Sequence, residues 1–194
     1  MKFILASKSG VRKQILDKYN IDCEVVASNV DEDQVKESLL NEGADPLFIS
    51  KNLAELKSIK VSSNNPEILV LGADSVISLN DQLINKPKSR DEAFEILKKL
   101  NDSKHYLISS VSISKNGAML WNYSDQSELK MKKHKDDDLL KYLGKIKTET
   151  LLAYGVYQIE ADGLNLFEYV KGNKDSIMGL PIKQIMDYIK QYKK

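Results

Sequence analysis

The sequence lacks a pair of cysteines, a long apolar run and an excess of charge of one sign. Cys23 is the only cysteine among 194 residues, so no disulfide can form within the chain. The 29 Lys and Arg residues nearly balance the 28 Asp and Glu residues, which gives a net charge of +1. No apolar run approaches the ~20 residues that a membrane helix needs. We therefore expect a cytoplasmic protein that binds neither nucleic acid nor a membrane.

Several common enzyme motifs are also missing. The sequence contains no Walker-type phosphate loop, no G-x-G-x-x-G, no H-E-x-x-H and no G-x-S-x-G. The two histidines, His105 and His134, lack metal-ligand spacing, and no motif connects Cys23 to an activating base. These absences argue against kinases, P-loop ATPases, zinc proteases and α/β-hydrolases.

The chain does contain enough apolar sequence for a sizeable core, since 42% of its residues are hydrophobic. Its length fits one domain, which we expect to span residues 1–194. Apolar periodicity predicts strands at residues 2–6, 23–27, 68–73, 76–78, 83–84, 106–114, 118–131, 153–159 and 166–170. It predicts helices at residues 9–19, 36–41, 46–60, 91–100, 135–143 and from 181 onward, and an acidic turn at 30–33. Helices and strands alternate early and strands pair locally later, which indicates a mixed α/β fold.

The segment LASKSGVR at residues 5–12 joins a predicted strand to a predicted helix. The N–H groups and dipole of a helix N-terminus favour phosphate, hydroxyls add donors, and a guanidinium can bind two oxygens at once. Ser7 and Arg12 are therefore candidate phosphate ligands. The alternative is an ordinary helix cap, and Ser9 is the better candidate for that role.

Acidic residues follow two of the predicted strands. Asp74 comes directly after the apolar run 68–73 and is predicted to lie at the end of a buried strand, where α/β folds commonly place catalytic groups. Its carboxylate could hold Mg²⁺ or accept a proton from water, or it could bind its own backbone in a turn. Asp31 and Glu32 form a second acidic pair, which either binds a metal or faces solvent.

Six short segments, taken together and in order, resemble the Maf family of nucleotide pyrophosphatases. They are LASKSGVR at residues 5–12, LAELKS at 53–58, GAD at 72–74, KP at 86–87, GVYQIE at 155–160 and GLP at 179–181. Each segment is weak alone, but the set spans nearly the whole chain. The resemblance implies a mixed α/β fold similar to that of ITP pyrophosphatases. That fold has a twisted central sheet flanked by helices, and two lobes with a cleft between them.

The resemblance also implies an activity. It implies hydrolysis of a nucleoside triphosphate to a monophosphate and pyrophosphate with a divalent cation, Mg²⁺ or Mn²⁺. It also suggests that the protein is a homodimer. Hydrolysis of a phosphate anhydride needs charge neutralisation on phosphate oxygens and an oriented water more than a covalent nucleophile. Carboxylates combined with Arg and Lys side chains are sufficient for this chemistry.

The functional positions of the family carry over residue by residue. The implied phosphate ligands are Ser7, Arg12, Lys57 and Lys86. Glu32 and Asp74 would hold the metal and the attacking water, with Asp74 as the proton acceptor. Together with Lys86 they form the expected catalytic set. Without the resemblance, Lys57 and Lys86 would be read as ordinary surface lysines.

Three further positions correspond to family positions that tune the choice of base, namely Val11, Ser75 and Glu160. The segment EADGLNLFE at residues 160–168 resembles the branch that acts on 7-methyl-GTP, whereas the branch that cleaves dTTP and UTP usually has Gln in place of Glu160. A carboxylate can accept hydrogen bonds from a guanine-type base but offers no donor to O4 of thymine or uracil. We therefore expect a purine or modified-purine substrate, cleared in nucleotide-pool sanitation. Val11 and Gly10 depart from the family pattern.

Other functions remain open at this point. The protein could be a dTTP or UTP pyrophosphatase, or a nucleotide-binding regulator of cell division with little turnover. It could also be a generic phosphosugar or nucleotide hydrolase, which absence of pyrophosphate among the products would support.

Overall fold

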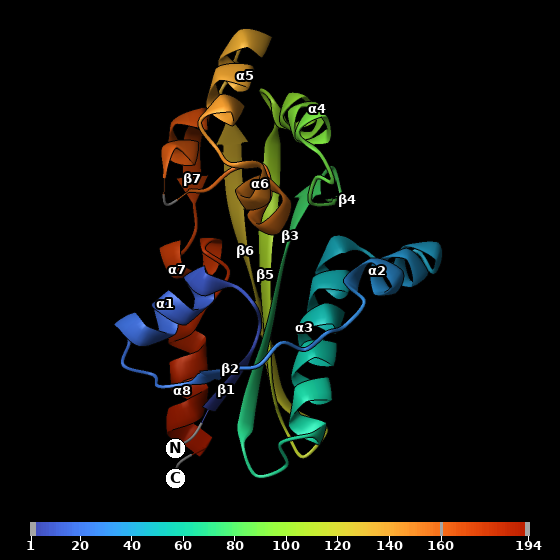
Figure 1. Cartoon of the computed structure of the whole chain (residues 1–194), viewed down its shortest axis with the longest axis vertical. Helices are drawn as coiled ribbons and strands as arrows, with labels where there is room; N and C mark the ends of the chain where they lie inside the picture. The colour runs from blue at the N-terminus through green and yellow to red at the C-terminus, as the bar shows by residue number, and fades with distance from the viewer. Residues whose placement is uncertain (1–2, 160, 193–194) are drawn as a thin grey trace. The chain divides into compact units, whose positions relative to one another are not determined.

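The computed structural model describes residues 3–159 and 161–192. Within them, a seven-stranded sheet has the order β2-β1-β3-β5-β6-β7, with β4 paired to β3, and helices flank it (Figure 1). The strands are β1 (Phe3–Ala6), β2 (Glu24–Val25), β3 (Leu69–Leu79), β4 (Gln82–Ile84), β5 (Lys104–Lys115), β6 (Ala118–Met131) and β7 (Phe167–Lys171). The α-helices are α1 (Gly10–Lys18), α2 (Glu32–Asn41), α3 (Pro46–Ser63), α4 (Arg90–Leu100), α5 (Asp136–Gly144), α6 (Thr148–Tyr154), α7 (Lys174–Ile177) and α8 (Ile182–Tyr192), and η1 (Asp162–Leu166) is a 3₁₀ helix. The mixed α/β prediction is confirmed, since β1 pairs in parallel with β2 and β3 while β4 and β7 pair antiparallel.

Internal contacts divide the chain into two compact units. Unit 1 contains the residues up to Val76, the segment Ile108–Gln126 and the residues from Asn173 onward. Unit 2 contains Ile77–Leu107 and Ser127–Gly172. Each unit has an apolar core of its own, and a single domain over residues 1–194 stays a prediction.

In unit 1 the side chains of the sheet alternate between two helical layers, because strand residues have a period of two. Phe3 and Leu5 of β1 pack against α1 and α8. Ile4 and Ala6 of the same strand pack against Val61 of α3. Figure 1 shows α1 and α8 on one side of these strands and α3 on the other. The same alternation decides which helix each side chain of β3 meets.

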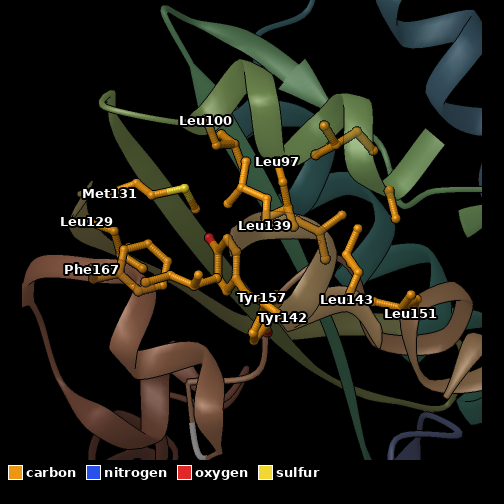
Figure 2. Packing of buried hydrophobic residues seen from close by; sticks show 14 residues of the cluster. Leu97, Leu100, Leu129, Met131, Leu139, Tyr142, Leu143, Leu151, Tyr157 and Phe167 are labelled. Atoms are coloured by element: carbon orange, nitrogen blue, oxygen red, sulfur yellow. The ribbon is translucent and has the colours of Figure 1, made fainter. Parts of the chain in front are cut away.

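In unit 2 the core lies between the helices α4, α5 and α6 and one face of the sheet. Figure 2 shows Leu97 of α4 and Leu139 of α5 beside Tyr157, and Leu151 of α6 beside Leu143 in the same cluster. Helix α4, predicted at residues 91–100, is amphipathic, and Ser89 caps its N-terminus by accepting from the amide of Glu92. Its buried positions are Ala93, Ile96, Leu97 and Leu100. That spacing of three and four residues places them on one side of a helix.

The two tight turns that join β3 to β4 and β5 to β6 have backbone conformations in the left-handed region. Asn80 and Asp81 have φ of 51° and 61° between β3 and β4, and Asn116 and Gly117 have φ of 50° and 71° between β5 and β6. Asn, Asp and Gly tolerate this conformation better than other residues, which is why these pairs signal tight turns.

Among the described helices, none has the length and apolar character that a membrane span requires.

Two local predictions outside β3 were wrong. Residues 153–159 do not form a strand: α6 extends to Tyr154 and ends at Gly155, whose φ is 97°. Val156 and Tyr157 are buried as loop residues, so their apolar character reflects burial in the unit 2 core. The acidic turn at 30–33 is instead the start of α2, whose cap is Asp31. Acidic residues favour that position because they interact well with the helix dipole.

Candidate active site

Strand β3 carries the central candidate residue, Asp74. The expectation that Asp74 ends the strand was wrong, because β3 continues to Leu79 and pairs with β4 from Ile77 onward. An apolar run marks burial, whereas the length of a strand depends on backbone pairing, so the two need not end together. The neighbouring strand β1 does end here, at Ala6, which pairs with Gly72. Asp74 therefore lies just beyond the end of the adjacent parallel strand.

Gly72 allows α3 to approach β3 unusually closely. A Cβ added at Gly72 would lie 2.1 Å from the carbonyl oxygen of Ala54 and 2.7 Å from the amide nitrogen of Ser58. No side chain larger than hydrogen fits such an approach. Lys57 lies between those two helical residues, and Asp74 is the next residue of β3 on the same face. The close approach thus brings the amine of Lys57 to the carboxylate of Asp74.

Lys57 bridges two carboxylates. Its Nζ lies 2.8 Å from Oδ1 of Asp74 and 2.8 Å from Oε1 of Glu32, which stands in the first turn of α2. Lys57 and Asp74 are 6% and 5% exposed, while the side chain of Glu32 is 38% exposed. Charges this deeply buried are tolerated when they are paired, as they are here. The other oxygen of Asp74, Oδ2, is buried and has no hydrogen-bond partner among the described residues.

Arg12 of α1 is held by four hydrogen bonds. Its Nε donates to the carbonyl of Gly179 at 3.0 Å, and Nη1 donates to the carbonyl of Ala73 at 2.9 Å and to Oγ of Ser7 at 3.2 Å. Its Nη2 donates to Oγ of Ser75 at 3.0 Å. A guanidinium has five N–H groups, so at most one remains for a ligand. The grip on two phosphate oxygens that the sequence suggested does not fit this geometry.

The electrostatics of unit 1 couple Arg12 to the two carboxylates. Burial lowers the pKa of the Arg12 guanidinium, and the negative charges of Asp74 and Glu32 raise it. Arg side chains stay protonated at neutral pH, so Arg12 adds a second cation to that of Lys57. The site therefore contains two cations and two carboxylates.

The structure brings together most of the candidates that the sequence predicted. The residues gathered in unit 1 are Ser7, Arg12, Glu32, Lys57, Asp74 and Ser75. Ser9 caps α1, as expected, since its Oγ accepts from the amide of Arg12. Val11 is partly buried against the apolar core of unit 1. Lys86 lies in unit 2, in the exposed segment after β4, and Glu160 lies outside the described residues, so both roles stay predictions.

Sequence reasoning missed three contributors. Gly72 was noted only as part of a motif, although the steric role of a glycine is not visible without its neighbours. Ser109 of β5, whose Oγ lies 3.0 Å from Oγ of Ser75, belongs to a serine-rich strand that gave no signal. The carbonyl of Gly179 could not be recognised, because a backbone acceptor has no sequence signature. Asp31 caps α2 through Oδ1, which accepts from the amide of Gln34 at 3.1 Å, so it needs no catalytic explanation.

The carboxylates fit a divalent cation that takes most of its ligands from elsewhere. The described residues contain no group of three or more His, Cys, Asp or Glu side chains placed to hold a metal. Mg²⁺ in nucleotide enzymes is commonly bound by one or two carboxylates plus phosphates and water. The buried and unpartnered Oδ2 of Asp74, with Glu32 nearby, matches that donor set.

Fold and site together define a mixed α/β protein that sets two carboxylates against two cations beside the end of a parallel strand. Residues 2–192 match the family described as Maf-like protein, and the chain belongs to that family. It is 56% identical over 189 residues to a nucleoside triphosphate pyrophosphatase of Pelagibacter ubique, and the matched region covers 97% of each chain. It is 32% identical over 193 residues to a 7-methyl-GTP pyrophosphatase of Brucella abortus, which covers 100% of this chain and 97% of that one. A solved Ham1 protein of Staphylococcus aureus is similar over 68% of this chain and 72% of that chain, with 14% identity and a TM-score of 0.46.

Proposed function

We propose that this protein hydrolyses nucleoside triphosphates to nucleoside monophosphates and pyrophosphate with the help of Mg²⁺ or Mn²⁺. The observation that carries the proposal is the buried carboxylate of Asp74, which has one oxygen paired with Lys57 and the other unpartnered. Membership of the Maf family and the names of the relatives, which are pyrophosphatases, support the same reaction.

Each residue of the site has a role in this reaction. Asp74 accepts the proton of the attacking water through its unpartnered Oδ2. Lys57 and the remaining N–H of Arg12 neutralise charge on the phosphate oxygens, and Ser7 donates its hydroxyl. Glu32 and Asp74 would hold the divalent cation, which when bound supplies charge neutralisation and acidifies its water ligands. Lys86 is proposed as a further phosphate ligand.

We further propose a purine or modified-purine triphosphate as the substrate and nucleotide-pool sanitation as the role. The carboxylate expected of Glu160 favours a guanine-type base, because it accepts hydrogen bonds and donates none. One relative is named a 7-methyl-GTP pyrophosphatase, which supports this choice. A homodimer and a cytoplasmic location are part of the same proposal.

A substrate panel tests the reaction. Purified protein is incubated with purine, pyrimidine and 7-methylated triphosphates in Mg²⁺ or Mn²⁺, and pyrophosphate release is followed. Asp74→Asn should nearly abolish turnover and leave nucleotide binding measurable. The matched control is Asp81→Asn in the exposed β3–β4 turn, where Asn tolerates the positive φ and activity should be unchanged. Full activity of Asp74→Asn, or products without pyrophosphate, would contradict the assignment.

The choice of base has a separate test. Glu160→Gln should move the preference from purine toward pyrimidine triphosphates, because an amide can donate to O4 of uracil or thymine. The ratio of kcat/KM for GTP-type and UTP-type substrates measures the shift. An unchanged ratio would contradict the role given to Glu160 without affecting the proposed reaction.

A further inference from the structure

Lys57 lies where a cation that binds both carboxylates would lie. Its Nζ is 2.8 Å from Oδ1 of Asp74 and 2.8 Å from Oε1 of Glu32. A Mg²⁺ ion would lie about 2.1 Å from each oxygen that it binds. An ion shared by these two oxygens on the side of Lys57 would overlap the ammonium group. The ion and Lys57 therefore cannot both hold this pair of oxygens from that side.

The remaining donor does not provide an independent metal site. Oδ2 of Asp74 has no hydrogen-bond partner among the described residues, so it can accept a ligand. An ion bound through this oxygen alone would lie close to the positive charges of Lys57 and Arg12. Two carboxylates against two monovalent cations leave no net negative charge to attract a divalent ion. Without nucleotide, the four charged groups neutralise one another.

The two cations differ in their freedom to move. Arg12 donates to four acceptors in three segments, namely Ser7, Ala73 and Ser75 of β3, and Gly179, so its guanidinium is fixed. Lys57 ends in a single ammonium group on a flexible stem of four carbons, and it forms ion pairs with the carboxylates of Glu32 and Asp74. A triphosphate carries several anionic oxygens that can replace the carboxylates as ion-pair partners of the ammonium group. Lys57 is therefore the exchangeable cation of the site.

We propose that Lys57 is an internal counter-cation that occupies Glu32 and Asp74 until a triphosphate arrives, so that the divalent cation binds with the nucleotide and not before it. When phosphate oxygens attract the ammonium group, Oδ1 of Asp74 and Oε1 of Glu32 become available to the metal. Lys57 then has two successive partners, first the carboxylates and then the phosphates. This inference rests on the proposed function for the identity of the nucleotide, but its first consequence concerns metal binding alone.

The test measures Mn²⁺ binding to the nucleotide-free protein by electron paramagnetic resonance of the free ion. The wild-type protein should bind Mn²⁺ weakly, and Lys57→Met should bind it at least tenfold more tightly because the competing charge is gone. Lys51→Met removes an exposed lysine of the same helix and serves as the matched control, with no change in Mn²⁺ affinity expected. Lys57→Gln provides a second neutral side chain if the methionine variant does not fold, and circular dichroism checks each variant.

A second measurement adds a triphosphate analogue with a non-hydrolysable α,β bond. In the wild-type protein the analogue should tighten Mn²⁺ binding at least tenfold, and by linkage Mn²⁺ should tighten analogue binding by the same factor. In Lys57→Met the coupling should be much smaller, since the nucleotide-free protein already binds the ion. Tight Mn²⁺ binding to the nucleotide-free wild type, or no gain in affinity in Lys57→Met, would overturn the inference. Failure of the wild type to release pyrophosphate would refute the proposed function instead.

Discussion

Replacement of Gly72 by alanine tests how closely the site depends on the contact between α3 and β3. The added Cβ would lie 2.1 Å from the carbonyl oxygen of Ala54, 2.7 Å from the amide nitrogen of Ser58 and 3.0 Å from its Cβ. The two nearest atoms belong to the backbone of α3, so no rotation of a side chain can relieve the overlap. The helix or the strand must move.

The size of that movement follows from the contact distances. Ordinary van der Waals contact begins at 3.4 Å, so the separation from the Ala54 oxygen must grow from 2.1 Å by about 1.3 Å. Overpacking of a buried site commonly costs about 1–3 kcal/mol of stability, and the free energy of unfolding should fall by at least that much. A displacement of about 1 Å can also reduce a rate by on the order of 10²-fold. Lys57 moves with α3, so its distance to Asp74 should increase and turnover should fall.

Urea unfolding and pyrophosphate release measure the two effects separately. Gly144→Ala is the matched control, because a Cβ at this last residue of α5 meets nothing within 4 Å. Alanine there should be neutral or stabilise the protein by about 0.5–1 kcal/mol, with unchanged turnover. The reasoning is refuted if Gly72→Ala retains wild-type stability and activity.

Three further predictions concern other parts of the chain. Ser75→Ala removes the acceptor of Nη2 of Arg12 and should lower the free energy of unfolding by about 1–3 kcal/mol, measured in urea; an unchanged value would contradict the role of this hydrogen bond. Burial lowers the pKa of His105 from 6.5 to about 4, so the unfolded chain binds more protons between these values and stability is lost as the pH falls below 6.5. Between pH 7 and pH 4 the free energy of unfolding of the wild type should fall by about 3 kcal/mol more than that of His105→Gln. An equal fall in the two proteins would contradict the lowered pKa of His105 in the folded state. Leu97→Ala should cost about 2–5 kcal/mol in thermal or urea unfolding because Leu97 is fully buried, whereas the exposed Leu140→Ala should cost less than about 0.5 kcal/mol. Similar losses in the two leucine variants would contradict the assigned core.

The elements with a strong local signal could be predicted from the sequence. Helix α4 combines a capping serine with apolar residues on one face, and it was located within one residue. The turn at Asn80 and Asp81 combines residues that tolerate positive φ with flanking apolar residues, and strands were predicted on both sides of it, at residues 76–78 and 83–84. In both cases the interactions that define the element lie within a few residues of one another.

The errors arose where burial was mistaken for strand structure. Val156 and Tyr157 are apolar because they pack into the core of unit 2, although their backbone forms no strand. The opposite error occurred at Asp74, where a polar side chain interrupts an apolar run but the backbone stays extended. Hydrophobicity reports the environment of a side chain, whereas strand pairing depends on partners that are distant in the sequence.

The candidate site shows why its residue types could be found but not their contacts. Asp74 and Ser75 are neighbours in β3, and neighbouring strand residues face opposite sides of the sheet. Asp74 therefore meets Lys57 of α3, and Ser75 meets Arg12 of α1, so one strand couples cations from two helical layers. The segments LAELKS and GAD thus contact each other. Arg12 of LASKSGVR contacts GLP through the carbonyl of Gly179 and GAD through the carbonyl of Ala73. Their order along the chain indicated the family, but only the pairing of faces explains why each segment contains a lysine, an arginine or a glycine at that position.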